Sequence, residues 1–385
     1  MSSYENRAAY LRQTLQEISP EQALHMVRHD DAILLDVRDA DEIKDGLPSP
    51  AHHLARGQLE LRVHHVCDDK QRPIAVMCAG GLRSLFAVES LKNLGYENVY
   101  SIRGGYKQWK ESALEIRIPQ QLSTQAKERY ARHLLVPEVG EAGQLKLMHS
   151  RVLLIGVGGL GSPAALYLAA AGVGTIGIVD ADVVESSNLQ RQIIHGEDQL
   201  GKLKVDSAAT AIGRLNSMIK VQTHPHYLDE NNALEILSQY DLILDGSDNF
   251  KTRYLINDAC VKLGIPNIHA AVYRFEGYVT TFGSNKEAPC YRCIYPELPP
   301  PEMAPSCAEA GVLGVLPGVI GVLQAVEALK VLLGIGSNLV GKMLRYDALH
   351  NQVSILQLDK ADDCLCGHAP ENIQLKPIEA YACAI

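Results

Sequence analysis

The sequence lacks long apolar runs, a secretory leader and clusters of positive charge, and each absence excludes a class of protein. No uninterrupted run of about eighteen or more apolar residues occurs in the 385 residues, which argues against a membrane span. The first residues, MSSYENRAAYLRQ, are polar and of mixed charge, which argues against a secretory signal. A formal net charge of -9 without dense Lys and Arg argues against binding to nucleic acid and suits a cationic protein partner. We therefore expect a cytoplasmic protein with no membrane and no nucleic-acid partner.

The composition is that of a globular protein with more than one core. With 385 residues, of which 46% are hydrophobic and 21% charged, the chain is too long for one typical domain. The stretch EIRIPQQLST interrupts the apolar periodicity near residues 115–124, where Pro119 breaks the pattern and Ser123 or Thr124 can cap the next helix. The expected divisions are an N-terminal tail (1–16), a first domain (17–115), a linker (116–122) and a second domain (123–385).

Both domains have the alternation of an α/β fold. In the first, apolar runs at 32–36, 73–78 and 98–102 alternate with helical patterns such as 84–95, which predicts a small parallel sheet covered by helices. In the second, strands and helices alternate up to about residue 272. YVTTFG (278–283), KMLRYDA and QVSILQL then follow as β pieces without crossover helices. This predicts a Rossmann-like doubly wound sheet with an antiparallel extension.

A cysteine lies between a strand and a helix in CAGGLRS, residues 78–84. Backbone N–H groups of such a loop form an anion-binding nest, so Cys78 is a candidate reactive thiolate, with Arg83 beside it. A buried core cysteine is the alternative. With DVR at 36–38, Gly104-Gly105 and Trp109, residues 17–115 resemble a rhodanese domain. The resemblance implies that Cys78 carries sulfur as a persulfide and that Arg83 orients the loop or stabilises the anion.

The second domain begins with a glycine motif that several nucleotide-binding proteins share. Gly156, Gly158 and Gly161 have the GxGxxG spacing after an apolar strand, and Asp180 ends the next strand. These residues alone fit a nicotinamide dinucleotide. Asn188, Arg191 and Lys204 follow, however, and a polar donor with two cations suits a triphosphate, so ATP is the better ligand.

Two carboxylates follow a buried strand in DLILDGSDN, residues 241–249. Asp245 and Asp248 then lie at the carboxyl edge of the sheet, where ligands bind in such folds. One of them facing the phosphates would hold Mg²⁺. Alternatively, Asp248 only caps the helix that begins near Asn249.

The second domain resembles the molybdopterin-synthase adenylyltransferase (MoeB) and thiamine adenylyltransferase (ThiF) branch of the ubiquitin-activating-enzyme-like superfamily. RYARH, GVGGLG, DADVVESSNLQRQ, GKLKV, DGSDN, PCYRC and GVIG occur in the family order over about residues 123–367. The resemblance implies ATP, Mg²⁺ and a homodimer in which Arg132 enters the neighbouring subunit's ATP site. The implied nucleotide-binding residues are Gly156, Gly158, Gly159, Gly161, Asp180, Asn188, Arg191, Lys204 and Asp248, of which Arg191 and Asp248 are also candidate catalytic residues.

Cysteines near the C-terminus suggest a metal site. Cys290 and Cys293 have a spacing typical of tetrahedral zinc sites, and Cys364 with Cys366 is the candidate second pair, although its single intervening residue demands an adjusted turn. His368 and Cys383 are possible substitutes. Cys307 follows the proline-rich stretch 295–307 and is either an acyl-capturing nucleophile or a bystander. Cys67, Cys260, His195 and His269 are expected to be structural.

The two resemblances together imply a two-step reaction. ATP and the C-terminal glycine of a small ubiquitin-like carrier of the MoaD or ThiS type, ending in Gly-Gly, give an acyl adenylate. The Cys78 persulfide, loaded by a cysteine desulfurase or other donor, then converts it to a thiocarboxylate used for molybdopterin, thiamine, cysteine or tRNA thiolation. The alternatives are an adenylyltransferase whose rhodanese domain only docks a sulfur donor, an NAD-dependent oxidoreductase, and an adenylating enzyme acting on tRNA, which the charge disfavours.

Overall fold

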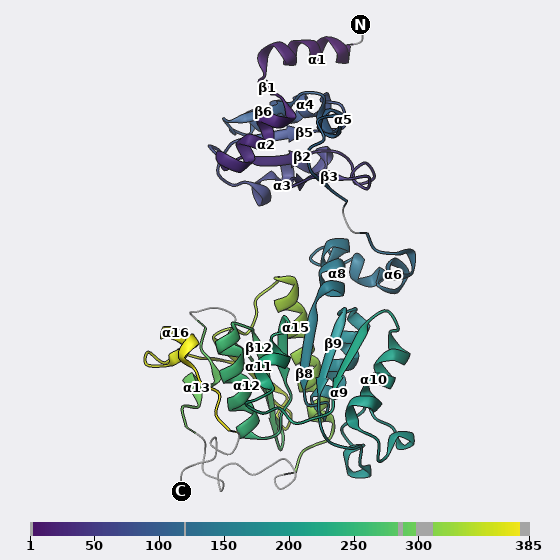
Figure 1. The fold of residues 1–385 in the computed structure, drawn as a ribbon, viewed down its shortest axis with the longest axis vertical. Helices are drawn as coiled ribbons and strands as arrows, with labels where there is room; N and C mark the ends of the chain where they lie inside the picture. The colour runs from purple at the N-terminus through teal and green to yellow at the C-terminus, as the bar shows by residue number, and fades with distance from the viewer. Residues whose placement is uncertain (1–2, 119–120, 284–287, 298–310, 378–385) are drawn as a thin grey trace. The chain divides into compact units, whose positions relative to one another are not determined.

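The chain folds into two compact units, Met1–Gln121 and Leu122–Ile385, in a computed structural model. The structure describes residues 3–118, 121–283, 288–297 and 311–377 (Figure 1). Each unit has its own sheet and its own hydrophobic core.

The first unit is a five-stranded parallel sheet in the order β1-β6-β5-β2-β4. Residues 3–14 of the predicted tail form a helix, α1, whose Ala8 and Leu11 are buried and whose Arg7 pairs with Glu89 of α4. At the other end, β7 pairs with β3, so residues 116–117 of the predicted linker belong to this unit. The elements are α1 (Ser3–Thr14), β1 (Glu17–Ile18), α2 (Pro20–His29), β2 (Ile33–Asp36), β3 (Leu47–Pro48), β4 (His52–His53), η1 (Arg56–Gln58), α3 (Leu59–Val66), β5 (Ile74–Met77), α4 (Arg83–Asn93), β6 (Val99–Ile102), α5 (Gly105–Glu111) and β7 (Ile116–Arg117).

The second unit is an eight-stranded sheet in the order β10-β9-β8-β11-β12-β13-β14-β15. Strands β10 to β12 are parallel and β12 to β15 antiparallel, which confirms the doubly wound sheet with an antiparallel extension. Its strands are β8 (Arg151–Ile155), β9 (Thr175–Val179), β10 (Lys220–His224), β11 (Leu242–Asp245), β12 (Asn267–Tyr273), β13 (Glu276–Phe282), β14 (Lys342–Asp347) and β15 (Gln352–Gln357). Its helices are α6 (Thr124–Arg129), α7 (Ala131–Leu134), α8 (Gly140–His149), α9 (Gly161–Ala171), η2 (Ser186–Asn188), η3 (Glu197–Gln199), α10 (Lys204–Leu215), α11 (Ala233–Leu237), α12 (Phe250–Leu263), α13 (Tyr291–Ile294), α15 (Val315–Leu333), α16 (Leu365–His368) and η5 (Pro370–Asn372).

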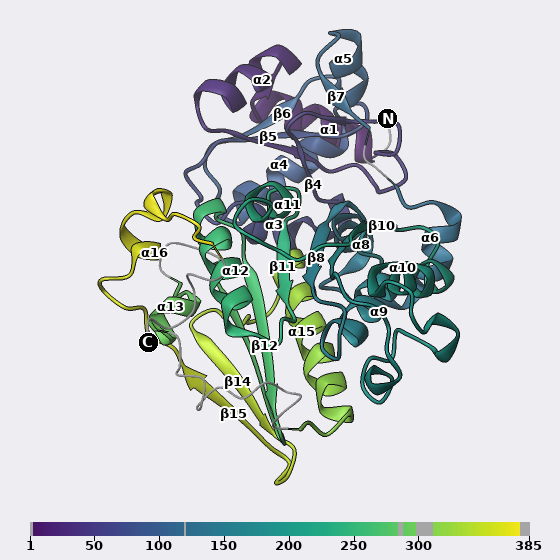
Figure 2. The ribbon, with the colours of Figure 1, turned by 60° about the horizontal axis from the view of Figure 1, so that its bottom comes forward.

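Helices cover both faces of this sheet because its central strands are apolar on both sides (Figure 2). In β8, Val152 and Leu154 join the core with α9, α10 and α15, whereas Leu153 and Ile155 join the core with α11 and α12. The alternation follows from the two-residue period of a strand.

Helix α15 is apolar and long enough to cross a membrane by length and composition alone. It packs instead on α9, β12 and β13, and Ile320, Ala325 and Ala328 on it belong to the hydrophobic core. The packing of α15 in the core therefore explains its apolar sequence, because a helix buried within a globular protein is apolar on most of its surface.

Candidate functional site

A glycine turn leads from β8 into α9. Gly156 has φ +86°, a left-handed conformation that glycine adopts without strain. A Cβ on Gly161 would lie 2.2 Å from the Gly156 carbonyl oxygen, so α9 can start this close to β8 only with glycine there. The turn aims the N-terminus of α9, the positive end of its dipole, at the carboxyl edge of the sheet.

A cavity of about 140 Å³ opens at this edge. It lies between β8 and β11, where the strand order reverses, which is the usual ligand position in open α/β sheets. A neighbouring cavity of about 350 Å³ shares Gly156, Asp180 and Asp248 with it and has Leu228 and Val179 in its wall. The predicted residues in the lining of the first cavity are Gly156, Gly158, Gly159, Asp180, Arg191, Lys204 and Asp248.

The charged residues of the cavity are held by specific partners. Asp180 accepts hydrogen bonds from the backbone N–H groups of Val157 (3.0 Å) and Asp182 (2.9 Å), while its burial raises its pKa. The Lys204 Nζ lies 2.8 Å from Asp182 and the side chain is only 9% exposed. Arg191 donates to the carbonyl of Ser187. Both predicted cations therefore flank the cavity, and Lys204 is already paired with a carboxylate.

The two carboxylates at the end of β11 and in the turn after it have different surroundings. Asp245 is fully buried and bonds to His269 and Ser247, whereas Asp248 is exposed and lines both cavities. The idea that Asp248 merely caps α12 is wrong, because Asn249 is the N-cap and accepts from the Thr252 N–H. A carboxylate that faces a cavity with cations fits the carboxylate-plus-phosphate set that Mg²⁺ prefers.

Some cavity residues carry no sequence signal that we used. Asp182, Gln192 and Arg253 line the first cavity, and the Nε of Arg253 and the Oε1 of Gln192 are buried without a hydrogen-bond partner among the residues that the structure describes. Asp182, two residues after Asp180 in DAD, could have been found from that spacing.

Three predicted nucleotide-binding residues are not in the lining of either cavity. Gly161 begins α9. Asn188 is buried in η2, where its Oδ1 accepts from the Glu185 N–H. Arg132 is exposed on α7.

In the first unit, the 78–84 loop joins β5 to α4. Cys78 is 1% exposed and its Sγ accepts a hydrogen bond from the Gly81 N–H at 3.2 Å. The loop is tied down from α5, because the Tyr106 N–H donates to the Cys78 carbonyl. A Cβ on Gly105 would lie 2.2 Å from that carbonyl oxygen, which explains the glycine at this position.

Arg83 is engaged by two carboxylates from the segment after β2. It bonds to Glu42 at 2.5 and 2.7 Å and to Asp39 at 3.2 Å. The hydrogen bond from Arg83 lowers the pKa of Glu42 to about 2. The Arg83 side chain therefore fastens the start of α4 to that segment, which agrees with the loop-orienting role and leaves less of its charge for an anion.

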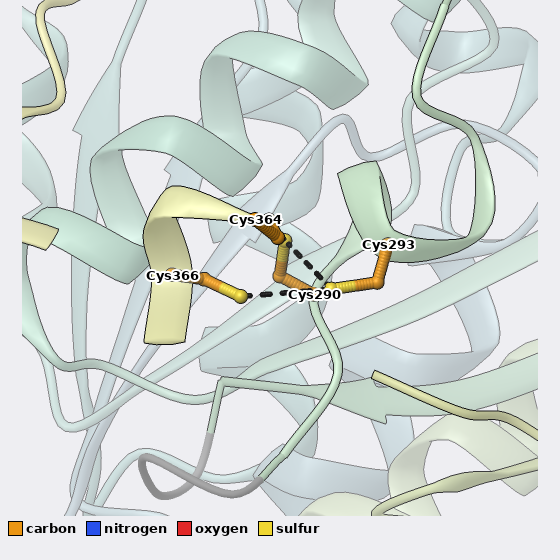
Figure 3. A group of neighbouring side chains, drawn as sticks. All are labelled: Cys290, Cys293, Cys364 and Cys366. Atoms are coloured by element: carbon orange, nitrogen blue, oxygen red, sulfur yellow. Dashed lines mark hydrogen bonds between the residues drawn. The ribbon is translucent and has the colours of Figure 1, made fainter. Parts of the chain in front are cut away.

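Four thiols from two distant segments meet in one cluster (Figure 3). Cys290 and Cys293 flank the start of α13, while Cys364 and Cys366 lie at the start of α16. The Sγ atoms of Cys290 and Cys364 and those of Cys293 and Cys366 are 3.6 Å apart, and those of Cys290 and Cys293 are 3.8 Å apart. A tetrahedral zinc with bonds of about 2.3 Å requires sulfur separations of about 3.8 Å. The set fits structural zinc, with Cys364 as a full member.

The other candidate ligands and cysteines lie elsewhere in the chain. His368, a possible substitute ligand, is not in the cluster. Cys307 and Cys383 lie outside the described residues. Cys67 and Cys260 are in hydrophobic cores, where burial raises the pKa of both thiols.

The fold and the site define a nucleotide-binding α/β unit preceded by a unit that presents a loop cysteine. The sequence model of the ThiF family matches residues 130–367, and that of the rhodanese-like domain matches residues 19–112. The chain belongs to the ThiF family and carries a rhodanese-like domain at its N-terminal side.

Curated relatives have the corresponding names. The adenylyltransferase and sulfurtransferase MOCS3 of Mus musculus is 49% identical over 66% of this chain and 55% of its own length. The sulfur carrier protein adenylyltransferase of Thermus thermophilus is 47% identical over 66% of this chain and 96% of its own length. The chain thus spans about half the length of MOCS3 but nearly all of the Thermus protein.

Solved structures agree on the fold. Escherichia coli MccB superposes with a TM-score of 0.56 at 20% identity, over 69% of this chain and 84% of that chain. A structure of the same protein with ATP gives a TM-score of 0.53 at 22% identity, over 72% and 83%.

Proposed function

We propose that this protein uses ATP to adenylate the C-terminal glycine of a small ubiquitin-like sulfur carrier and then converts the adenylate to a thiocarboxylate with sulfur from Cys78. The observation that carries the proposal is the union, in one chain, of a ThiF-family nucleotide cavity and a rhodanese-like cysteine loop. The name of MOCS3 combines adenylyltransferase and sulfurtransferase activities, and the name of the Thermus enzyme includes a sulfur carrier protein.

ATP would occupy the two joined cavities. The wider cavity, with Val179 and Leu228 in its wall, suits the adenine ring, and Asp180 at the junction accepts from the ribose hydroxyls. Arg191 and Lys204 neutralise the phosphates, with the Gly158-Gly159 backbone behind them. Lys204 then exchanges its contact with Asp182 for a phosphate oxygen.

In the first step, a carboxylate oxygen of the carrier's terminal glycine attacks the α-phosphorus of ATP, and the bond to pyrophosphate breaks. The cations stabilise the negative charge that develops on the leaving group. Asp248 would hold Mg²⁺, which supplies further charge neutralisation on the phosphates. No proton transfer is needed, because both the nucleophile and the leaving group are anions.

In the second step, the terminal sulfur of a Cys78 persulfide attacks the acyl carbon and AMP leaves. The resulting acyl disulfide is then cleaved by a thiol reductant, whose sulfur bonds to Cys78 while the carrier keeps its thiocarboxylate. A second thiol of the reductant releases Cys78 from this mixed disulfide. In the alternative route, Cys307 first displaces AMP to form a thioester, and the persulfide then displaces the Cys307 thiolate. The Gly81 N–H at the Cys78 Sγ supports this role, because such donors stabilise a sulfur anion.

The four-cysteine cluster would hold a structural Zn²⁺ that joins α13 to α16. Four thiolates leave no open coordination position, so the metal takes no part in the chemistry. Its contribution is to the folding of the segment after β15.

The expected assembly is a cytoplasmic homodimer supplied by a cysteine desulfurase or other persulfide donor. The exposed position of Arg132 on α7 agrees with an arginine that enters the partner subunit's nucleotide cavity. Arg132→Ala and Asp180→Asn, each inactive alone, would then restore up to about a quarter of the activity when mixed. Failure to complement would contradict the shared site.

The test of the adenylation step is carrier-dependent exchange of pyrophosphate into ATP. Each Gly-Gly-ending small protein of the source genome is incubated with this protein and Mg²⁺-ATP. We expect exchange with one or more carriers and none with Asp180→Asn, while Cys78→Ala exchanges normally. Exchange with no carrier, or NADH binding without ATP binding, would refute the proposal.

In the alternative function, the rhodanese-like unit only docks a sulfur donor, and the Cys78→Ala variant distinguishes this from the proposal. The alternative requires that Cys78→Ala still forms the thiocarboxylate at the normal rate. The hydrogen bonds that hold the Cys78 loop favour sulfur transfer by Cys78 over docking alone.

A further inference from the structure

A buried His–Asp pair lies directly beneath the loop that carries Asp248. Asp245 ends β11, and His269 lies opposite it in the parallel register of β11 and β12, which run side by side in Figure 2. The Nδ1 of His269 is 2.7 Å from the Oδ2 of Asp245, and the two residues are 3% and 0% exposed. Burial lowers the pKa of His269. Because an ionised carboxylate can only accept, the Nδ1–H of the ring donates to Asp245.

The other carboxylate oxygen of Asp245 holds the loop. Its Oδ1 accepts hydrogen bonds from the Ser247 N–H (3.0 Å) and from the Ser247 hydroxyl (2.6 Å). The Asp245 carbonyl in turn accepts from the Gln324 side chain. Arg253 also holds the Ser247 carbonyl, to which its Nη2 donates at 3.0 Å. Because the next residue is Asp248, the orientation of the Asp245 carboxylate contributes to where the Asp248 side chain enters the two cavities.

The histidine ring is itself fixed. Its centroid lies 5.2 Å from that of Tyr291 and 5.9 Å from that of Phe282, so the ring packs against two aromatic side chains. A buried ionic or polar pair contributes little net stability compared with apolar residues of similar volume. The pair's contacts, from the His269 ring through the Asp245 carboxylate to Ser247, point instead to placement of the loop.

We propose that His269 is a positioning residue for the adenylation step: its ring orients the Asp245 carboxylate, which fixes Ser247 and thereby the metal-binding carboxylate of Asp248. This rests on the proposed function for its catalytic consequence. The placement of the loop itself is independent of that function and can be measured without nucleotide.

The test compares three substitutions in the protein with both units present. His269→Leu removes the donor at similar volume, and His269→Asn keeps an amide N–H near the position of Nδ1. Thr281→Val is the matched control, because Thr281 is equally buried on β13 and bonds to Glu327 of α15, away from the loop. His269→Gln replaces the leucine variant if that variant does not fold, since its amide reaches the position of Nε2 instead.

The first readout is hydrogen–deuterium exchange of the peptide containing residues 246–249, without nucleotide. We expect exchange at least about tenfold faster in His269→Leu and unchanged rates in His269→Asn and Thr281→Val. Unchanged exchange in the leucine variant overturns the proposal, whether or not the protein binds ATP.

The second readout is the affinity for ATP with Mg²⁺ and with EDTA. Loss of an outer residue that orients a metal ligand costs about 10- to 100-fold in metal affinity. We therefore expect the gain in affinity from Mg²⁺ to fall at least about tenfold in His269→Leu and to persist in the other two variants. If Mg²⁺ raises the ATP affinity equally in all variants, His269 has no role in the adenylation step. If the unsubstituted protein does not bind ATP, the proposed function is refuted, and the hydrogen–deuterium exchange result alone decides whether His269 places the loop.

Discussion

Substitution of Gly161 by alanine tests the turn that brings α9 to the nucleotide cavity. The added Cβ would lie 2.2 Å from the carbonyl oxygen of Gly156 and 3.1 Å from its carbon. To reach an ordinary contact distance, the Gly156 carbonyl or the start of α9 must move by roughly 1 Å. Because both are backbone, no side-chain rotation can relieve the contact, and we expect a loss of about 3 kcal/mol, at the upper end for overpacking.

The matched control is Gly213→Ala on α10. A Cβ at Gly213 meets nothing within 4 Å, so this substitution should stabilise the protein by about 0.5–1 kcal/mol through helix propensity. Urea unfolding gives the free energies, and pyrophosphate exchange gives the activity. A displacement of roughly 1 Å at the cavity predicts a loss of about a hundredfold in the exchange rate for Gly161→Ala.

The reasoning is refuted if Gly161→Ala unfolds within about 0.5 kcal/mol of the unsubstituted protein and exchanges pyrophosphate at its rate. A stability loss with normal exchange would refute only the link between the turn and the cavity.

Three further substitutions test the cysteine cluster and the first unit. Cys364→Ser should lower the zinc content well below one ion per chain, measured by mass spectrometry, together with the thermal unfolding temperature; a full zinc content would exclude Cys364 as a ligand. In Gly105→Ala, the added Cβ would lie 2.2 Å from the Cys78 carbonyl oxygen, so this substitution should abolish persulfide loading of Cys78. A Cβ at Gly80 meets nothing within 4 Å, so Gly80→Ala should leave the loading unchanged. Equal loading of the two variants would refute the steric argument. The Arg83 hydrogen bond lowers the pKa of Glu42 from 4.5 to about 2. The stabilisation from this ion pair is therefore present above about pH 4.5 and is lost as the pH falls toward 2. Glu42→Gln should lower the unfolding free energy at pH 7 but not at pH 2, and an equal loss at both pH values would contradict the ion pair.

The fold could be predicted because its signals are local. Alternating strands and helices, followed by β pieces without crossover helices, predicted the parallel sheet and its antiparallel extension. Two of the three glycines of GxGxxG, Gly156 and Gly161, are required by backbone geometry within six residues, through the positive φ of Gly156 and the contact between Gly161 and the Gly156 carbonyl.

The site could be predicted only in part, because side-chain direction depends on residues far apart in sequence. Asp245 and Asp248 follow the same strand, and the burial of Asp245 against His269 distinguishes them only in the folded chain. Arg253 reaches the cavity from α12, and no motif that we used points to it.

The short CxC spacing was a further case. This spacing demands an adjusted turn, and the sequence alone does not show how both thiols reach one metal ion. In the structure, Cys364 is the N-cap residue of α16, so its side chain and that of Cys366 both reach the thiols from α13.

The central claim is that the two units perform one reaction sequence on one carrier. The most direct measurement is the intact mass of the Gly-Gly-ending carrier after incubation with this protein, Mg²⁺-ATP and a persulfide donor. The account predicts replacement of one oxygen by sulfur with the unsubstituted protein and no replacement with Cys78→Ala. An unchanged mass despite pyrophosphate release, or sulfur incorporation that persists in Cys78→Ala, would contradict it.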